Sequence, residues 1–214
     1  RYLRIGPNPI GSPGEGHHWF MGDGMVHGVR LAESDARWYR NRYVRSGSVA
    51  RHLGEPSRSE GWESTDFAPN THVLEHAGHT LALVEGGSSP YVLTEELDTV
   101  GPTDFEGTLQ MMGTLPAGYS AHPHQDPETG ELHAVSYNWL RGNQVDYTVR
   151  DTQGRVRRHV PIQVGGSPMM HDFALTENYV VIYDLPVVFD KRRALQGMPL
   201  AARIPTRLMM AAII

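Results

Sequence analysis

The chain contains no cysteine among its 214 residues. It therefore forms no disulfide framework, offers no thiolate ligand to a metal and has no cysteine nucleophile. The absence is consistent with a reducing compartment, so we expect a cytoplasmic protein.

Long apolar runs are absent as well. Hydrophobic residues make up 39% of the sequence, but no run approaches the ~18 residues that a transmembrane helix needs. Residues 1–16 are polar and rich in Gly and Pro, unlike the charged and then apolar pattern of a signal peptide. We therefore expect neither a membrane span nor a secretory leader.

The sequence also lacks an excess of positive charge and the common catalytic motifs. Acidic residues outnumber basic ones, 24 to 19, for a formal net charge of −5. This balance argues against nucleic acid as the main partner. No GxxxxGK[ST] loop, no GxGxxG entering a helix and no Gly-x-Ser-x-Gly elbow is present, so neither a phosphate loop nor a triad hydrolase is indicated.

Both ends of the sequence are unusual for natural termini, which are commonly polar and frayed. The first residue is Arg1 rather than Met, and residues 2–5 already have the character of a strand. Residues 208–214 are apolar. We therefore expect the chain to be a fragment of a longer protein.

The chain is rich in turn residues, with 23 Gly and 15 Pro, and its short apolar runs alternate with turn signals. Such runs separated by tight turns predict antiparallel strands. No segment of residues 1–190 carries a long apolar stripe with helical period. We predict an all-β protein with strands at residues 2–5, 80–84, 91–93, 133–137, 145–149, 156–164, 173–175 and 179–183.

Three histidines open similar units along the sequence. His72, His122 and His171 are separated by 50 and 49 residues, and each precedes a turn and an apolar strand. A period of ~40–50 residues is typical of propeller blades of four strands. Because equivalent positions on several blades point at one axis, distant histidines could meet there. A coincidental spacing in an antiparallel β protein is the alternative.

His122 and His171 are the best candidates for metal ligands. Each lies beside turn residues that lead into an apolar strand, and neutral imidazole is the commonest protein metal ligand. A ligating imidazole usually donates its second N–H to a carboxylate or carbonyl. Glu85 is the best internal partner, because it ends the apolar strand of residues 81–84. For all three, an ordinary structural role stays open from the residues alone.

The remaining histidines are weaker candidates. His72 follows a polar pair, Asn70 and Thr71, that indicates a loop, and His27 lies on an expected strand after a tight turn. Eight others have no special context: His17, His18, His52, His76, His79, His124, His133 and His159.

Eight short motifs carry further information. They are residues 2–9 (YLRIGPNP), 18–28 (HWFMGDGMVHG), 39–45 (YRNRYVR), 70–73 (NTHV), 81–86 (LALVEG), 120–123 (SAHP), 129–132 (TGEL) and 170–176 (MHDFALT). Together they resemble the carotenoid cleavage oxygenase family, which includes apocarotenoid and lignostilbene dioxygenases and a retinal pigment epithelium isomerase. The motifs run in the family's order from residue 2 to about residue 190, and Met21 departs from the family's usual acidic residue.

The resemblance implies a fold and a metal centre. It implies the N-terminal part of a seven-bladed β-propeller with antiparallel four-stranded blades, incomplete in this chain. It also implies Fe(II) held on the axis by four histidines, with His122 and His171 as the first two and Glu85 supporting an imidazole, His171. The other two ligands would lie outside this chain. The propeller part would cover residues 1–190, with a divergent or truncated tail at residues 191–214.

The activity implied by the resemblance is the oxidative cleavage by O₂ of a carbon–carbon double bond in a carotenoid, an apocarotenoid or a stilbene. The partners implied are an apolar polyene or stilbene, O₂ and, for substrate uptake by the full-length protein, a peripheral membrane surface. Because two ligands would be missing, we expect this chain alone to bind iron weakly and to be inactive. The alternative is a non-enzymatic β-propeller binding module whose histidines are structural.

Overall fold

The structure is a computed structural model. It describes residues 1–12, 17–33, 35–63, 65–109, 118–138, 142–166 and 168–188, together with Asp190, Arg193 and Gln196. The expected tail at residues 191–214 therefore lies outside the described residues, apart from Arg193 and Gln196.

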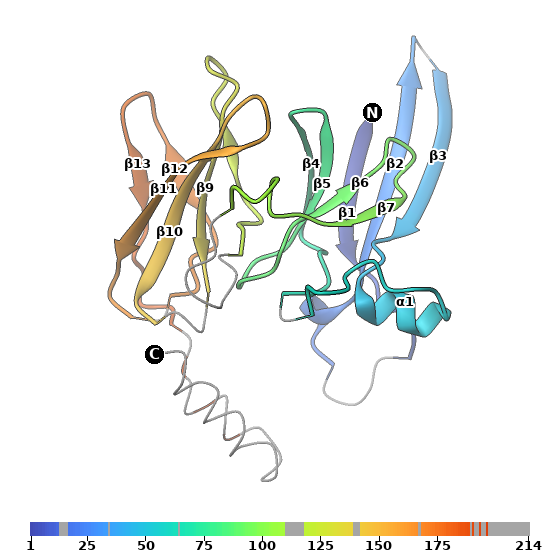
Figure 1. Ribbon diagram of the computed structural model, residues 1–214, viewed down its shortest axis with the longest axis horizontal. Coiled ribbons are helices and arrows are strands. Elements are labelled where there is room, and N and C mark those ends of the chain that lie inside the picture. Colours follow the sequence, from blue (N-terminus) through green and yellow to red (C-terminus); the bar gives the residue numbers. More distant parts are fainter. Residues whose placement is uncertain are drawn as a thin grey trace.

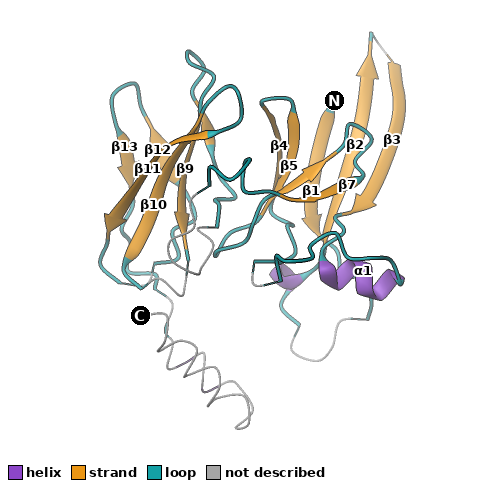
Figure 2. Ribbon diagram, in the orientation of Figure 1, coloured by secondary structure: helices purple, strands orange, loops and turns teal. Residues whose placement is uncertain are grey.

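Strands dominate the described residues (Figure 2). One short 3-10 helix, η1, and one α-helix, α1, interrupt them. In chain order the elements are β1 (Tyr2–Pro7), η1 (Trp19–Met21), β2 (Gly24–Ala32), β3 (Asp35–Tyr43), α1 (Gly47–Leu53), β4 (His72–His76), β5 (His79–Leu83), β6 (Tyr91–Leu93), β7 (Thr99–Pro102), β8 (His124–Gln125), β9 (Leu132–Tyr137), β10 (Gln144–Arg150), β11 (Val156–Gln163), β12 (Phe173–Leu175) and β13 (Val180–Ile182).

The strands form four antiparallel sheets, each made of consecutive strands. Their orders are β1-β2-β3, β4-β5-β6-β7, β11-β10-β9-β8 and β12-β13. The predicted strands therefore exist, and the two central sheets have four strands each. Among the described residues, no helix has the length and apolar character needed to cross a membrane.

Helix α1 was not predicted from the sequence. Ser46 caps it by accepting a hydrogen bond from the amide of Val49, and Gly54 ends it in the left-handed conformation with φ of 68°. Only Val49 and Ala50 of its seven residues are buried hydrophobics, which is too little for an apolar stripe with helical period.

Neighbouring sheets lie next to one another along the chain (Figure 1). Three hydrophobic clusters pack between them. The first joins β1 and β2 to β4, β5 and β6. The second joins β5 to β9 and includes Phe105 and Tyr119. The third joins β9 and β10 to β12. Each central sheet is therefore covered on both faces, as propeller blades are.

Alternation along single strands explains this two-sided burial. In β5, Ala82 faces the first cluster, whereas Leu81 and Leu83 face the second. In β9, Ala134 faces the second cluster, whereas Val135 and Tyr137 face the third. Because successive side chains of a strand point to opposite faces, one apolar run serves two cores.

The three histidines of the 50-residue period lie at equivalent places in successive sheets. His72 is the first residue of β4, His122 comes two residues before β8, and His171 comes two residues before β12. The predicted fold, part of a propeller with antiparallel four-stranded blades, is confirmed at this level. Seven blades would need a longer chain than this one, so the number of blades stays a prediction.

Candidate metal centre

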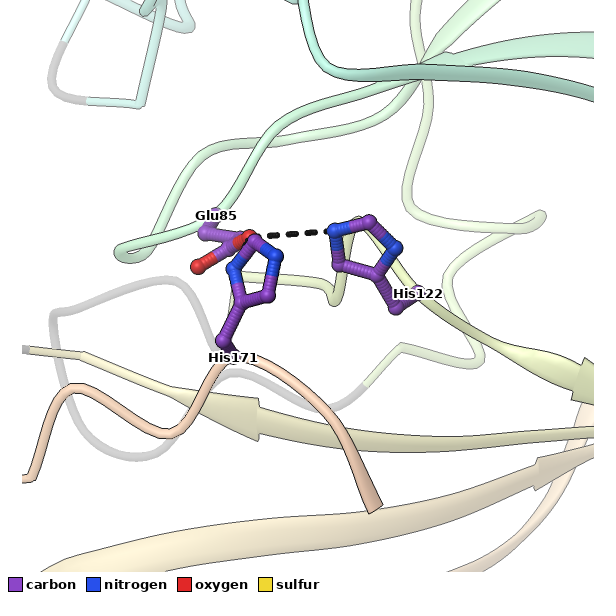
Figure 3. Close-up of side chains that lie close together, drawn as sticks. All are labelled: Glu85, His122 and His171. Atoms are coloured by element: carbon purple, nitrogen blue, oxygen red, sulfur yellow. Dashed lines mark ion pairs between the residues drawn. The ribbon is translucent and has the colours of Figure 1, made fainter. Parts of the chain in front are cut away.

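Glu85, His122 and His171 converge between the sheets (Figure 3). Glu85 follows β5, and the two histidines precede β8 and β12. One potential ligand atom from each residue lies within 4.8 Å of the others. Within the described part of the chain, this is the one group of three or more His, Asp or Glu side chains with metal-binding geometry.

A tight glycine turn positions Glu85. Gly86 and Gly87 have φ of 79° and 100°, values that side chains rarely allow. A Cβ at Gly87 would lie 2.5 Å from Nδ2 of Asn138, so the turn presses against the residue that follows β9. The chain therefore reverses at once after β5 and leaves the carboxylate facing the third sheet.

The segment before β8 fixes His122 through its backbone. The amide of His122 donates a hydrogen bond to Oγ of Ser120, and Ala121 is fully buried. Nδ1 of His72 lies 2.7 Å from the carbonyl oxygen of Ala121, and the His72 ring stacks on His122 with centroids 5.9 Å apart. His72 is therefore a neighbour that supports His122, and it is not a member of the ligand cluster.

His171 is held by the residues on either side of it. Met170 and Phe173 are buried in the third hydrophobic cluster, whereas the His171 side chain is 67% exposed. Its ring centroid lies 4.2 Å from that of His122. The two imidazoles are thus close enough to contact one ion.

The carboxylate of Glu85 lies between these groups. Its Oε1 is 2.6 Å from Nδ1 of His171 and 3.5 Å from Nε2 of His122. Its Oε2 accepts a hydrogen bond of 2.9 Å from the hydroxyl of Tyr137. The interaction with Glu85 raises the pKa of His122 above its ordinary value, against the opposing effect of burial.

The donor set fits a divalent transition metal. Nε2 of His122 is buried and has no hydrogen-bond partner, although a buried polar atom normally finds one. Imidazole nitrogens suit divalent transition metals such as iron, and a carboxylate beside a ligating imidazole can fix its orientation. A bound cation would give Nε2 of His122 the partner that it lacks, next to a second imidazole and a carboxylate.

Two other histidines, His27 and His124, are not members of the cluster. Nδ1 of His27 is 2.7 Å from the hydroxyl of Tyr39 on the β2-β3 hairpin. His124, which has no special context in the sequence, has Nε2 at 2.8 Å from Oδ1 of Asp172. Its proximity to the site was missed because the partner is distant in the sequence, although His124 and Asp172 each lie within two residues of a predicted ligand.

An open, mainly apolar pocket of about 360 Å³ adjoins His171. Tyr183, Leu185 and Val187 line it together with the segment 168–172. The pocket offers an apolar molecule a place beside the cluster.

The sequence matches a known family over nearly its full length. The family model described as retinal pigment epithelial membrane protein matches residues 1–211. A carotenoid cleavage oxygenase of Mycobacterium tuberculosis is 53% identical over 219 residues, which cover 100% of this chain and 42% of that protein. A carotenoid 9,10(9',10')-cleavage dioxygenase of Crocus sativus is 32% identical over 227 residues, covering 92% of this chain and 40% of that protein.

The fold is also similar to solved structures. The crystal structure of Pseudomonas brassicacearum lignostilbene dioxygenase matches with a TM-score of 0.76 and 31% identity, covering 92% of this chain and 43% of that one. The chain thus spans about two fifths of the length of these relatives.

Proposed function

Because the chain belongs to the carotenoid cleavage oxygenase family, we propose that the whole protein is an Fe(II)-dependent dioxygenase that cleaves a carbon–carbon double bond of a carotenoid, an apocarotenoid or a stilbene with O₂. The products are two carbonyl compounds. The proposal concerns the whole protein, since this chain spans about two fifths of its relatives.

One observation carries the proposal. Among the described residues, the buried Nε2 of His122 makes no hydrogen bond, and within reach it has only Glu85 Oε1 at 3.5 Å and the second imidazole of the cluster. A buried imidazole nitrogen without a partner costs free energy, and a metal ion removes that cost. In a non-enzymatic module with structural histidines, this nitrogen would need a hydrogen-bond partner of its own.

In this proposal His122 and His171 hold the iron and Glu85 orients His171. The proximity of Glu85 Oε1 to Nδ1 of His171 suits a hydrogen bond from Nδ1–H, which leaves Nε2 of that ring free for the metal. The raised pKa of His122 means that the metal competes with a proton for its nitrogen. Bound Fe(II) supplies the redox chemistry that activates O₂.

The apolar pocket beside His171 supports an apolar substrate. A polyene or stilbene carries few hydrogen-bonding groups, so it is recognised by shape and by apolar contacts. Leu185 and Val187 are 62% and 55% exposed, and they offer such contacts next to the cluster. The relatives named for carotenoid or lignostilbene cleavage act on molecules of this class.

The whole protein, purified without added metal, tests the proposal directly. Metal analysis should give iron at close to one atom per chain, and incubation with O₂ and a panel of one carotenoid, one apocarotenoid and one stilbene should give paired aldehyde products from at least one of them. A protein without stoichiometric metal and without cleavage of any panel member would favour the binding module instead.

A further inference from the structure

A buried tyrosine connects the third sheet to the carboxylate of the cluster. Tyr137 is the last residue of β9 and is 5% exposed. Its hydroxyl donates to Oε2 of Glu85, which belongs to the turn after β5 in the neighbouring sheet. The bond therefore spans two sheets and reaches the carboxylate oxygen that faces away from the two histidines.

We propose that Tyr137 is a positioning residue for the metal centre, acting on His171 through Glu85. The inference rests on the proposed function. With Oε2 held by the phenol, Oε1 is the oxygen left to face Nδ1 of His171, 2.6 Å away. The terminal torsion of a glutamate is broad, so without the phenol the carboxylate would sample other orientations. Tyr137 narrows that range and keeps the imidazole in one tautomer and one orientation.

Packing holds Tyr137 and Glu85 in place independently of the bond between them. The Tyr137 ring lies in the third hydrophobic cluster with Met170 and Phe173, the residues that flank His171. On the other side, Gly87 of the Glu85 turn has no room for a side chain against Asn138, which follows Tyr137. The donor, the acceptor and the imidazole are therefore carried by segments that contact one another directly, which lowers the entropic cost of orienting them.

The simpler interpretation is that the bond only satisfies two polar groups, because a buried phenol and a half-buried carboxylate each need a partner. The two interpretations differ in what the hydroxyl changes. A satisfied pair affects the folding stability alone. A positioning residue also changes the metal affinity, and does so only while Glu85 is present.

The test is Tyr137→Phe in the whole protein, titrated with Co(II) as a spectroscopic probe and with Fe(II) under argon. The expected result is a loss of metal affinity of about 3- to 10-fold, the size of one net hydrogen bond, with a changed Co(II) absorption spectrum. The matched control is Tyr147→Phe. It removes another phenol of the same sheet, whose hydroxyl lies 2.7 Å from Nδ1 of His133, and it should leave affinity and spectrum unchanged.

A double substitution tests the route through Glu85. Adding Tyr137→Phe to Glu85→Ala should change the metal affinity no further, because the residue through which the phenol acts is gone. Replacing Tyr137 with 4-aminophenylalanine keeps a donor at the same place and should restore most of the affinity. The 4-aminophenylalanine variant also tests the inference if Tyr137→Phe does not fold. A metal affinity of this variant near that of the parent supports the inference, and a metal affinity as low as that of Glu85→Ala overturns it.

The outcomes separate this inference from the proposed function. If the parent binds metal and Tyr137→Phe binds it equally well with the same spectrum, Tyr137 is structural and the inference is wrong while the proposed function stands. Equal losses from Tyr137→Phe in the presence and absence of Glu85 would also overturn it. If the parent itself binds no metal, the proposed function fails and the inference fails with it.

Discussion

His124 and Asp172 are hydrogen-bonded, 2.8 Å from Nε2 to Oδ1, and this contact links the segment carrying His122 to the segment carrying His171. The His124 ring also packs edge-on against Phe173, with centroids 4.7 Å apart. The two side chains are 41% and 52% exposed. The pair therefore lies beside the cluster and close to water, where solvent screening weakens ion pairs.

Because the pair is exposed, we expect its contribution to stability to be small. The coupling between His124→Ala and Asp172→Asn should be at most about 1 kcal/mol in a double-mutant cycle followed by chemical denaturation. The exposed pair Arg155–Glu106 is a control of the same kind, far from the cluster in the sequence. Coupling of several kcal/mol for His124 and Asp172 would mean that the pair is shielded in the whole protein.

Removal of either candidate ligand should abolish tight metal binding. His122→Ala and His171→Ala in the whole protein each take one imidazole from the cluster, so we expect substoichiometric iron and loss of cleavage. His27→Ala is the matched control, because His27 contacts Tyr39 on the β2-β3 hairpin. Stoichiometric iron in either ligand variant, measured by elemental analysis, would contradict the assignment.

Glu85 should matter less than the imidazoles if it orients His171 rather than binding the metal. Glu85→Gln keeps an oxygen that can accept from Nδ1 of His171, so we expect stoichiometric metal bound about 10- to 100-fold more weakly. A loss as complete as that of His122→Ala would instead make Glu85 a direct ligand. Competition with a chelator of known affinity measures the difference.

The sequence predicted the strands well because their signals are local. Alternation in residues 145–149 and the turn at residues 151–154 are properties of neighbouring residues, and β10 and β11 lie where they indicate. Helix α1 was missed because its pattern is too short to have a period. Local pattern therefore indicated most of the strands, but β3, β4, β7 and β8 were not predicted, and His72 begins β4 where Asn70 and Thr71 had indicated a loop.

The site was predictable only in part. The spacing of His122 and His171 put both at the start of a repeated unit, but the resemblance to a family, rather than the spacing, separated them from structural histidines. The roles of Tyr137 and His124 depend on partners 52 and 48 residues away. Such contacts are set by how the sheets pack, and no pattern along one strand reports them.

The apolar pocket gives a prediction about substrate affinity. Leu185→Asn replaces an apolar lining side chain by an amide, so we expect KM for the cleaved substrate to rise about 4-fold, since one buried methylene is worth about 0.8 kcal/mol. Val181→Asn is the control, because Val181 is also exposed but does not line the pocket. Steady-state kinetics measures KM for both variants. If the two substitutions raise KM equally, the pocket does not bind the substrate.

A buried pair between the second and third sheets makes stability depend on pH. Arg150 is 1% exposed, and its Nη1 lies 2.9 Å from Nδ1 of His76, whose Nε2 lies 3.0 Å from the carbonyl oxygen of Gly130. His76 is therefore neutral, accepting from the guanidinium and donating to the carbonyl. Burial lowers its pKa below the ordinary value, and the charge of Arg150 acts in the same direction against the bond to Gly130.

The sign follows from proton binding. In the unfolded chain, His76 has its ordinary pKa of about 6.5 and binds a proton below that pH, whereas in the folded chain its lower pKa keeps it neutral. The contribution of His76 to stability is therefore present above about pH 6.5 and is lost as the pH falls toward the lower pKa of the folded state. Glutamine at position 76 can accept from Arg150 and donate to Gly130 without titrating. We therefore expect the free energy of unfolding of the metal-free whole protein to fall less between pH 7.5 and pH 5.5 in His76→Gln than in the parent. The pH dependence of this free energy should differ between the two proteins by less than the uptake of one proton per molecule. Identical slopes from denaturant titrations at both pH values would show that His76 is not the group that couples folding to protons.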